Sequence, residues 1–167
     1  MRRTLLLLTT MTLALLMASS VALALDRISC QGGYCPGTTS DDVMSGTAVY
    51  DEMVGDGGND KLNGYGANDT LRGGLGNDTL NGGAGNDTLE DDSGTNTLNG
   101  GADEDVIWAN GGGDERAKVS GGSENDLVYA LDNARDTINC GTGTLDQVYN
   151  HDPGLDVVRG CEIIRPL

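Results

Sequence analysis

The chain of 167 residues lacks phenylalanine, and aromatic residues make up only 4% of it. So few large apolar side chains cannot fill a conventional hydrophobic core. Basic residues are also scarce, with 10 lysines and arginines against 26 aspartates and glutamates, which gives a formal net charge of −16. This charge argues against nucleic acid and anionic membranes as partners, because both would repel the protein. It favours a protein that gathers cations, with a disordered chain as the alternative for the metal-free state.

Residues that carry catalysis are missing or isolated. The one histidine, His151, lies in the turn sequence His-Asp-Pro-Gly, and no Gly-x-Ser-x-Gly, His-Glu-x-x-His or phosphate-binding loop occurs. Paired carboxylates for glycoside cleavage remain compatible with so acidic a chain. We nevertheless expect a protein that is not an enzyme.

Only one long apolar run occurs, close to the amino terminus. Arg2 and Arg3 precede an apolar stretch that reaches Val21, and Ala22-Leu23-Ala24 has the small-x-small pattern of a cleavage site. We expect residues 1–24 to be a signal peptide, with a membrane anchor as the alternative. No second run approaches the ~20 residues that a membrane-spanning helix requires, so the mature chain should be secreted and have no membrane span.

Glycine and aspartate are abundant instead, and aspartate recurs with a period of nine residues. The positions that follow this spacing are Asp42, Asp51, Asp60, Asp69, Asp78, Asp87, Asn96, Asp105 and Asp114. Two residues after each of them stands an apolar residue, except after Asp114, where Arg116 takes that place. A fixed period that carries both a carboxylate and an apolar residue is typical of a stacked-repeat solenoid.

The most regular units resemble a known repeat. They read Gly64-Tyr-Gly-Ala-Asn-Asp-Thr-Leu-Arg72, Gly73-Gly-Leu-Gly-Asn-Asp-Thr-Leu-Asn81 and Gly82-Gly-Ala-Gly-Asn-Asp-Thr-Leu-Glu90. This pattern is similar to the nonapeptide G-G-x-G-x-D-x-U-x of the repeats-in-toxin (haemolysin-type) calcium-binding family, in which U is a large apolar residue. The resemblance implies that position-six Asp side chains and backbone carbonyls of the loops bind calcium.

The spacing also predicts the fold. Glycine at positions one, two and four permits φ > 0 and a tight turn, and positions seven to nine form a short strand whose central apolar residue alone faces inward. Two units then form one coil, and strands of successive coils pair in parallel about 4.8 Å apart. We predict an all-β protein, a right-handed parallel β-roll (a two-sheet solenoid) of about seven coils, and expect a monomer.

The loops predict bound metal. Stacking the coils brings like-charged Asp side chains together, and their repulsion opposes folding until a divalent cation neutralises it. The donors are oxygen atoms only, and Ca²⁺ accepts six to eight oxygens in irregular geometry more readily than Mg²⁺ does. We therefore expect several Ca²⁺ ions and calcium-dependent folding. In the alternative, the aspartates merely cap the glycine turns.

Turns on one side recur every two units, so we expect Asp60 to share an ion with Asp78, and Asp69 with Asp87. The candidate metal-binding residues are Asp60, Asp69, Asp78 and Asp87, then Asp51, Asp105 and Asp126 as weaker sites, and the loop glycines Gly55, Gly57, Gly64, Gly66, Gly73 and Gly82. They lie mainly in a calcium-binding β-roll expected over residues 37–108.

Some units depart from the pattern. Asn96 replaces a charged residue, and Asp91 and Asp92 occupy glycine places, so this turn should bind metal weakly or differently. The wider spacing between Asp114 and Asp126 indicates an insertion near Lys118. We expect residues 109–167 to form degenerate repeats and a carboxy-terminal cap with few metal sites.

The four cysteines favour two disulfides. Cys30 and Cys35 enclose a short loop and should close an amino-terminal cap formed by residues 25–36. Cys140 and Cys161 are separated by one coil plus a short insertion, which places them within the Cα range of a disulfide. A four-cysteine zinc site is the alternative, but it lacks the C-x-x-C spacing.

We expect an extracellular calcium-binding protein with a structural or adhesive role towards an extracellular surface or protein. One alternative is a surface-binding or ice-binding β-solenoid that uses outward Thr side chains, namely Thr70, Thr79, Thr88 and Thr97. Another is a non-catalytic remnant of a secreted hydrolase or toxin.

Overall fold

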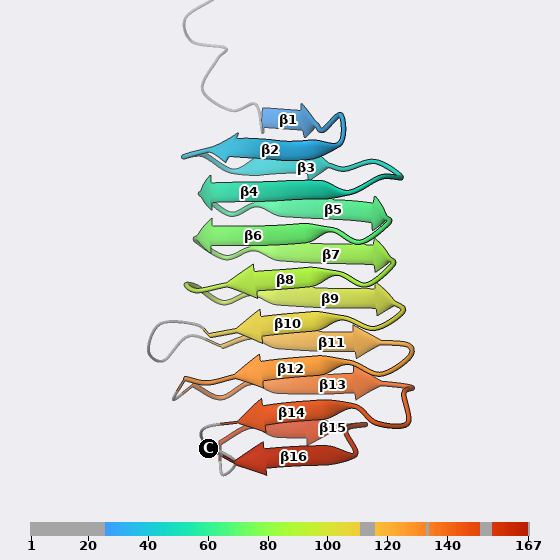
Figure 1. The fold of residues 1–167 in the computed structure, drawn as a ribbon. Helices are drawn as coiled ribbons and strands as arrows, with labels where there is room; N and C mark the ends of the chain where they lie inside the picture. Colours follow the sequence, from blue (N-terminus) through green and yellow to red (C-terminus); the bar gives the residue numbers. More distant parts are fainter. Residues whose placement is uncertain (1–25, 111–115, 133, 151–154, 167) are drawn as a thin grey trace, which may run out of the picture.

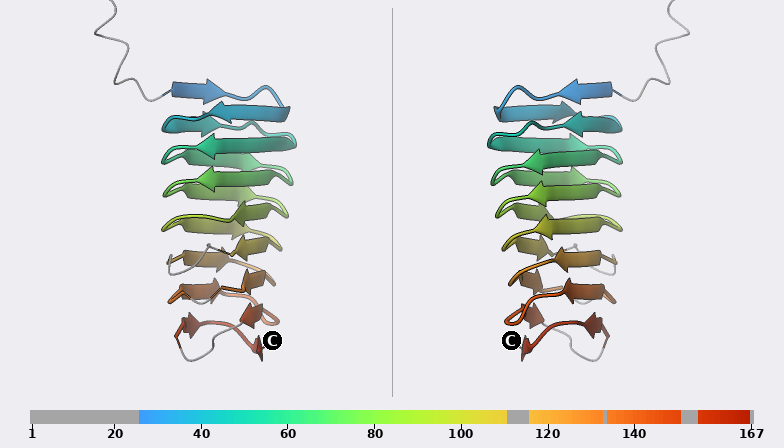
Figure 2. Two further views of the ribbon diagram at one scale, coloured as in Figure 1. Left: turned by 90° about the vertical axis from the view of Figure 1, so that its left-hand side faces the viewer. Right: turned by 90° about the vertical axis from the view of Figure 1, so that its right-hand side faces the viewer.

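The computed structural model describes residues 26–110, 116–132, 134–150 and 155–166. The expected signal peptide, Asp114 and His151 lie outside the described residues. The described chain is a stack of coils in which successive strands alternate between two parallel sheets (Figure 1). Figure 2 shows the coils following one another in chain order from β1 to β16. The predicted all-β solenoid of two parallel sheets is confirmed.

Over the described residues, each sheet contains eight strands. The first sheet consists of β1 (Asp26–Ser29), β3 (Asp42–Ser45), β5 (Lys61–Gly66), β7 (Thr79–Ala84), β9 (Thr97–Ala102), β11 (Lys118–Gly122), β13 (Thr137–Gly141) and β15 (Val157–Arg159). The second consists of β2 (Gly33–Thr38), β4 (Asp51–Gly57), β6 (Thr70–Leu75), β8 (Thr88–Asp91), β10 (Val106–Ala109), β12 (Leu127–Ala130), β14 (Gln147–Asn150) and β16 (Ile163–Pro166). No helix that could span a membrane occurs among the described residues.

The pairing register follows the repeat. Leu71 of β6 pairs with Leu89 of β8, and equivalent positions in neighbouring coils are 18 residues apart in this region. The interval widens to 21 residues between Asp105 and Asp126, and it is 19 or 20 residues in the next coils. Extra residues are therefore accommodated in the loops while the strands stay aligned.

One apolar side chain per strand forms a continuous buried ladder between the sheets. Its fully buried members are Met44, Met53, Leu62, Leu71, Leu80, Leu89, Leu98, Ile107, Val119, Val128, Ile138 and Val148. Each such side chain contributes about 1.5–3 kcal/mol by leaving water. Val119 aligns with Leu98, so the ladder continues past Arg116, which is exposed. Because of the insertion, extending the nine-residue period beyond Asp105 points to Arg116, whereas Val119 continues the apolar ladder.

The prediction that only the apolar residue of each strand faces inward is wrong. In β4, Asp51, Met53 and Gly55 are all buried and alternate with partly exposed residues. The strands extend beyond three residues, so positions six and one of the repeat also point between the sheets, on either side of the apolar ladder. The carboxylate and the first glycine are therefore interior residues.

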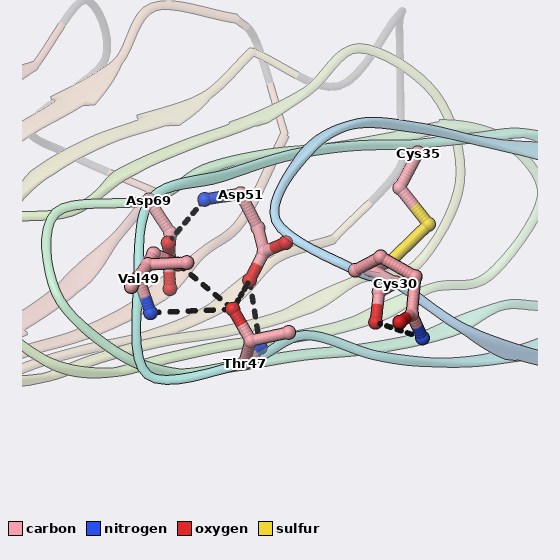
Figure 3. The surroundings of a disulfide bond; sticks show 7 residues. Cys30, Cys35, Thr47, Val49, Asp51 and Asp69 are labelled. Carbon is pink, nitrogen blue, oxygen red and sulfur yellow. Dashed lines mark hydrogen bonds between the residues drawn. A yellow bond between two sulfur atoms is a disulfide. The ribbon is translucent and has the colours of Figure 1, made fainter.

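Disulfides close both ends of the described roll. Cys30 bonds to Cys35, with Cα atoms 5.6 Å apart, and Cys140 bonds to Cys161 across neighbouring coils, with Cα atoms 5.2 Å apart. Figure 3 shows the first disulfide beside the loop that holds Thr47 and Asp51. The segment expected as an amino-terminal cap contributes β1 and β2, which pair in parallel with β3 and β4.

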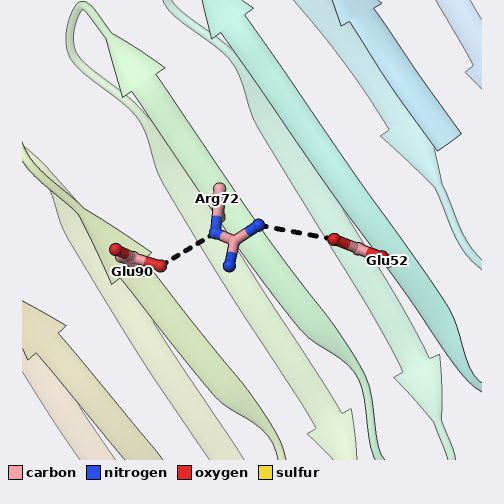
Figure 4. A network of polar contacts seen from close by, with 3 residues as sticks. All are labelled: Glu52, Arg72 and Glu90. Carbon is pink, nitrogen blue, oxygen red and sulfur yellow. Dashed lines mark hydrogen bonds and ion pairs between the residues drawn. The ribbon is translucent and has the colours of Figure 1, made fainter. Parts of the chain in front are cut away.

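The outer faces carry ladders of another kind. Arg72 on β6 lies between Glu52 and Glu90 on the neighbouring strands, at 3.4 Å and 2.8 Å (Figure 4). Farther along the same sheet, the rings of Trp108 and Tyr129 stack with centroids 3.9 Å apart. Because Arg72 and its two glutamates are partly exposed, these ion pairs add little stability compared with the buried apolar ladder.

Candidate metal sites between the coils

Position six of the repeat places its side chain at the inner edge of the roll, immediately before each strand. The two edges carry separate rows. One row contains Asp42, Asp60, Asp78, Asn96, Ala117 and Asp136, and the other contains Asp51, Asp69, Asp87, Asp105, Asp126 and Asp146. All twelve side chains are buried. Strand pairing thus brings together carboxylates that are distant in sequence.

From Asp60 and Asp69 onwards, each of these carboxylates accepts a hydrogen bond from a backbone N–H of the preceding coil. The backbone N–H of Asp60 donates to Asp78 Oδ1 at 2.7 Å, and that of Asp69 donates to Asp87 Oδ1 at 2.7 Å. These are the two pairs that the repeat spacing predicts to be neighbours. One carboxylate oxygen of each pair is therefore satisfied by the fold itself.

The second oxygen of most of these carboxylates has no protein partner. It is buried and forms no hydrogen bond in six regular units, at Oδ2 of Asp60, Asp69, Asp78, Asp87, Asp105 and Asp126. Leaving an ionised carboxylate oxygen buried and unpaired costs several kcal/mol. An interior row of such atoms therefore requires either protons or cations.

The first glycine of the repeat leaves room beside this second oxygen. A Cβ atom on Gly64 would lie 2.6 Å from the carbonyl oxygen of Gly82 and closer still to Asp69 Oδ2. We call this space a cradle: it is bounded by the position-one glycine, the carboxylate of the same unit and the position-one carbonyl of the next coil. The same arrangement recurs at Gly55, Gly82 and Gly100. Oxygen atoms facing such a gap suit a hard cation such as Ca²⁺.

The glycine roles differ from the sequence-based expectation. Positive φ is required at positions two and four, for example 106° at Gly74 and 128° at Gly76, but not at position one. Position one needs glycine because of space rather than conformation. At position three, a Cβ on Gly57 or Gly66 would meet nothing nearer than 3.6 Å. These two predicted site residues have no steric reason to be glycine.

Burial and mutual repulsion disturb the carboxyl groups. Desolvation, reinforced by the charges of Asp78 and Asp42, raises the pKa of Asp60 from 3.8 to about 6. Burial likewise raises the pKa of Asp69 and Asp87 to about 6, of Asp126 to about 7 and of Asp105 to about 8. Each shift means that the metal-free fold disfavours the charged form.

We expect the calcium-free roll to become more stable as the pH falls. Because these folded-state pKa values lie above the unfolded value of 3.8, their stabilising contribution is complete below about pH 3.8 and is lost as the pH rises through 6 to 8. Far-UV circular dichroism in EDTA should therefore show more β-structure at mildly acidic than at mildly alkaline pH. With saturating Ca²⁺ the order should reverse, because protons compete with the ion. A β-sheet signal in EDTA that grows as the pH rises would contradict this picture.

In two early units a threonine of the loop hydrogen-bonds the cradle oxygen Oδ2, while Oδ1 of Asp42 and of Asp51 has no hydrogen-bond partner. Thr47 donates to Asp51 Oδ2 from its backbone N–H at 2.7 Å and from Oγ1 at 2.9 Å (Figure 3). Thr38 does the same to Asp42. The cradle oxygen of Asp51 is thus already hydrogen-bonded, which gives a physical reason for a weaker site there. The sequence feature that marks these units is threonine at position two. Its effect on the metal site becomes clear only from the hydrogen bonds that it forms within the loop.

The carboxy-terminal part offers fewer cradles. Ala109, Ala130 and Cys140 occupy the buried position-one row, so a Cβ atom stands where the glycine units leave space. Asp146 has protein partners for both oxygens, which accept hydrogen bonds from the N–H groups of Asp126 and Gly143.

A surface cavity of about 540 Å³ near Asn96 is lined in part by the basic residues Arg116, Lys118 and Arg135. A divalent cation would be repelled there.

Side chains alone do not form a metal cluster in the part of the chain that the structure describes, because no three His, Cys, Asp or Glu groups converge. This agrees with the cradle geometry, in which each gap receives one or two carboxylates and otherwise backbone carbonyls. Such a donor set fits Ca²⁺, which accepts carbonyl oxygens freely, better than it fits zinc, which prefers nitrogen and sulfur ligands.

Comparison with known proteins identifies the repeat. The family model for the RTX calcium-binding nonapeptide repeat (four copies) matches residues 36–71, 54–89 and 90–115. No curated protein and no solved structure matches the chain. The matched region contains the cradles at Gly55, Gly64, Gly82 and Gly100. Repeats of this family bind calcium, and the geometry of the described coils is consistent with that property.

Proposed function

We propose that this protein, which over residues 36–115 belongs to the RTX calcium-binding nonapeptide repeat family, is an extracellular structural or adhesive module whose folding depends on several Ca²⁺ ions. The observation that carries the proposal is the row of buried carboxylate oxygens without a protein partner, each facing a cradle beside a position-one glycine. Bound Ca²⁺ supplies the positive charge that these oxygens require. The protein residues provide carboxylate and carbonyl ligands and hold them on a rigid parallel register.

We assign the ions primarily to cradles with an unpartnered carboxylate oxygen. The proposed carboxylate ligands are Asp60, Asp69, Asp78, Asp87, Asp105 and Asp126, in the cradles of Gly55, Gly64, Gly73, Gly82, Gly100 and Gly121 respectively. Asp51 is a minor site in this proposal, because Thr47 already donates two hydrogen bonds to its cradle oxygen. Because these sites follow one another along a single rod and each coil stabilises its neighbours, we expect the Ca²⁺ ions to bind cooperatively.

An extracellular location is supported by two observations. Both disulfides are of a kind that persists in oxidising compartments, and residues 1–24 have the composition of an export signal. Millimolar Ca²⁺ in many extracellular environments would fill even weak sites. The proposed role is non-catalytic, because the carboxylates are buried between the sheets and not exposed in a cleft.

A regular array for ice or another crystalline surface has less support. Thr79 and Thr97 are neighbours on the first sheet, but Lys61 and Lys118 flank them in the same row. Thr70 and Thr88 likewise make a pair on the second sheet, between Glu52 and Val106. Two-residue rows interrupted by long or charged side chains do not present a flat repeated surface.

Replacing Asp87 by Asn should weaken calcium binding much more than replacing Asp146 by Asn. Asp87 Oδ2 is an unpartnered cradle oxygen, whereas both oxygens of Asp146 accept hydrogen bonds from the protein. We expect the midpoint of a calcium titration, followed by far-UV circular dichroism, to rise roughly tenfold for Asp87→Asn and little for Asp146→Asn. Equal shifts would refute this assignment of sites, and a wild-type protein that binds no Ca²⁺ in calorimetry would refute the proposed function.

A further inference from the structure

The unit from Asp91 to Asn99 departs from the repeat at two positions that matter for a cation. At position six, Asn96 Oδ1 accepts the N–H of Asp78 at 2.8 Å, as an aspartate would. Its Nδ2 group, however, donates to the carbonyl oxygen of Ser93 at 3.1 Å. The second carboxylate oxygen of the regular units is here replaced by a hydrogen-bond donor, which cannot bind a cation. On this evidence alone, the row would lose a site.

The second departure returns a carboxylate to the interior. Asp91 stands at position one, where the regular units have glycine, and its side chain is buried with a relative exposure of 2%. Asp91 Oδ1 accepts a hydrogen bond from the N–H of Ser93 at 3.3 Å, but Oδ2 has no hydrogen-bond partner. A buried, half-satisfied carboxylate at the end of β8 needs a counterpart.

Asp91 points into the cradle of the preceding coil. A Cβ atom on Gly73 would lie 2.6 Å from Asp78 Oδ2 and closer still to Asp91 Oδ2, so both unpartnered oxygens face the same space. At Gly55, Gly64 and Gly82 the corresponding neighbours are one carboxylate and one backbone carbonyl. The Gly73 cradle therefore carries two carboxylates.

We propose that Asp91 and Asp78 together bind one Ca²⁺ ion in the Gly73 cradle, so that the unit without a carboxylate at Asn96 still supplies one through Asp91. Two facing carboxylates repel each other strongly unless they share a cation or a proton. The oxygen-only donors and the calcium sites proposed for neighbouring coils favour the cation, so this inference rests on the proposed function. The next coil of this row offers no carboxylate at position six, since Ala117 stands there with basic residues on the surface beside it.

The test compares Asp91→Asn with Asp92→Asn. Asp92 is an exposed neighbour, so its replacement removes the same charge without touching the cradle. Native mass spectrometry should count one Ca²⁺ fewer for Asp91→Asn than for the wild type, and the calcium midpoint of the far-UV circular dichroism signal should rise roughly tenfold. Asp92→Asn should retain the wild-type ion count and midpoint. Circular dichroism at saturating Ca²⁺ establishes that each variant folds.

If Asp91→Asn keeps the wild-type ion count and midpoint, the two carboxylates share a proton and the inference is overturned. A wild-type protein that binds no Ca²⁺ would instead remove the proposed function itself.

Discussion

The protein in EDTA at neutral pH should lose its β-sheet signal in far-UV circular dichroism and regain it on addition of millimolar Ca²⁺. In the absence of the ion, ionised carboxylates at Asp60, Asp69 and Asp87 are buried without a partner for one oxygen each. A ligand that binds only the folded state at 100 times its Kd stabilises that state by about 2.7 kcal/mol per site. Several sites together match the 5–15 kcal/mol by which a typical domain is stable.

The controls separate calcium from the other constraints on the chain. Mg²⁺ at the same concentration should restore little structure, because it requires regular octahedral geometry and gives up its water reluctantly. Reducing the two disulfides should lower the calcium-free stability further, since they link Cys30 to Cys35 and Cys140 to Cys161 at the two ends. A chelated and reduced sample that melts cooperatively at the wild-type temperature would refute the metal-dependent fold.

Replacing Gly82 by Ala should be far more damaging than replacing Gly66 by Ala. The new Cβ at position 82 would lie 2.7 Å from the carbonyl oxygen of Gly100 and closer still to Asp87 Oδ2. The added methyl group would therefore fill the cradle. We expect the loss of one ion and a further destabilisation of about 1–3 kcal/mol from overpacking. At Gly66 the nearest atom to a new Cβ is the carbonyl oxygen of Ala84 at 3.6 Å, and φ is not in the left-handed region.

The measurement is a calcium titration followed by circular dichroism, together with the Tm at saturating Ca²⁺. Gly82→Ala should raise the calcium midpoint and lower the Tm, while Gly66→Ala should leave both close to the wild-type values. Both substitutions remove a loop glycine from a regular repeat, so a general loss of loop flexibility would affect them alike. Equal effects would show that the cradle is not the place where the ion binds.

Much of the architecture follows from the nine-residue period. Because side chains alternate along a strand, Leu62 and Leu80 must share one interior face when their strands pair, and the same register places Asp60 above Asp78. The period also led to an error, because it pointed to Asp114 and Arg116 as the next unit. Val119 continues the ladder instead, since the pairing of β11 with β9 tolerates extra loop residues.

The details of the candidate sites depend on contacts between loops. The sequence predicts a weaker site at Asp51 than at Asp69, but the contact responsible appears only in the structure: Thr47 hydrogen-bonds the cradle oxygen of Asp51, and the corresponding oxygen of Asp69 has no hydrogen-bond partner. The requirement for glycine at position one was attributed to φ, whereas it arises from the space beside a carboxylate of the same unit and a carbonyl of the next coil. Neither contact can be read from composition or period.

For this chain the sequence alone determined the repeat length, the buried apolar ladder and the rows of carboxylates, because these depend only on strand alternation and on stacking at a constant interval. The tertiary structure decided which carboxylate oxygens lack a partner, and it brought Asp91 to Asp78 across a coil boundary. The reason is geometric: hydrogen bonding and ion binding depend on distances of a few tenths of an ångström between neighbouring coils, and such distances arise only when the whole roll is assembled.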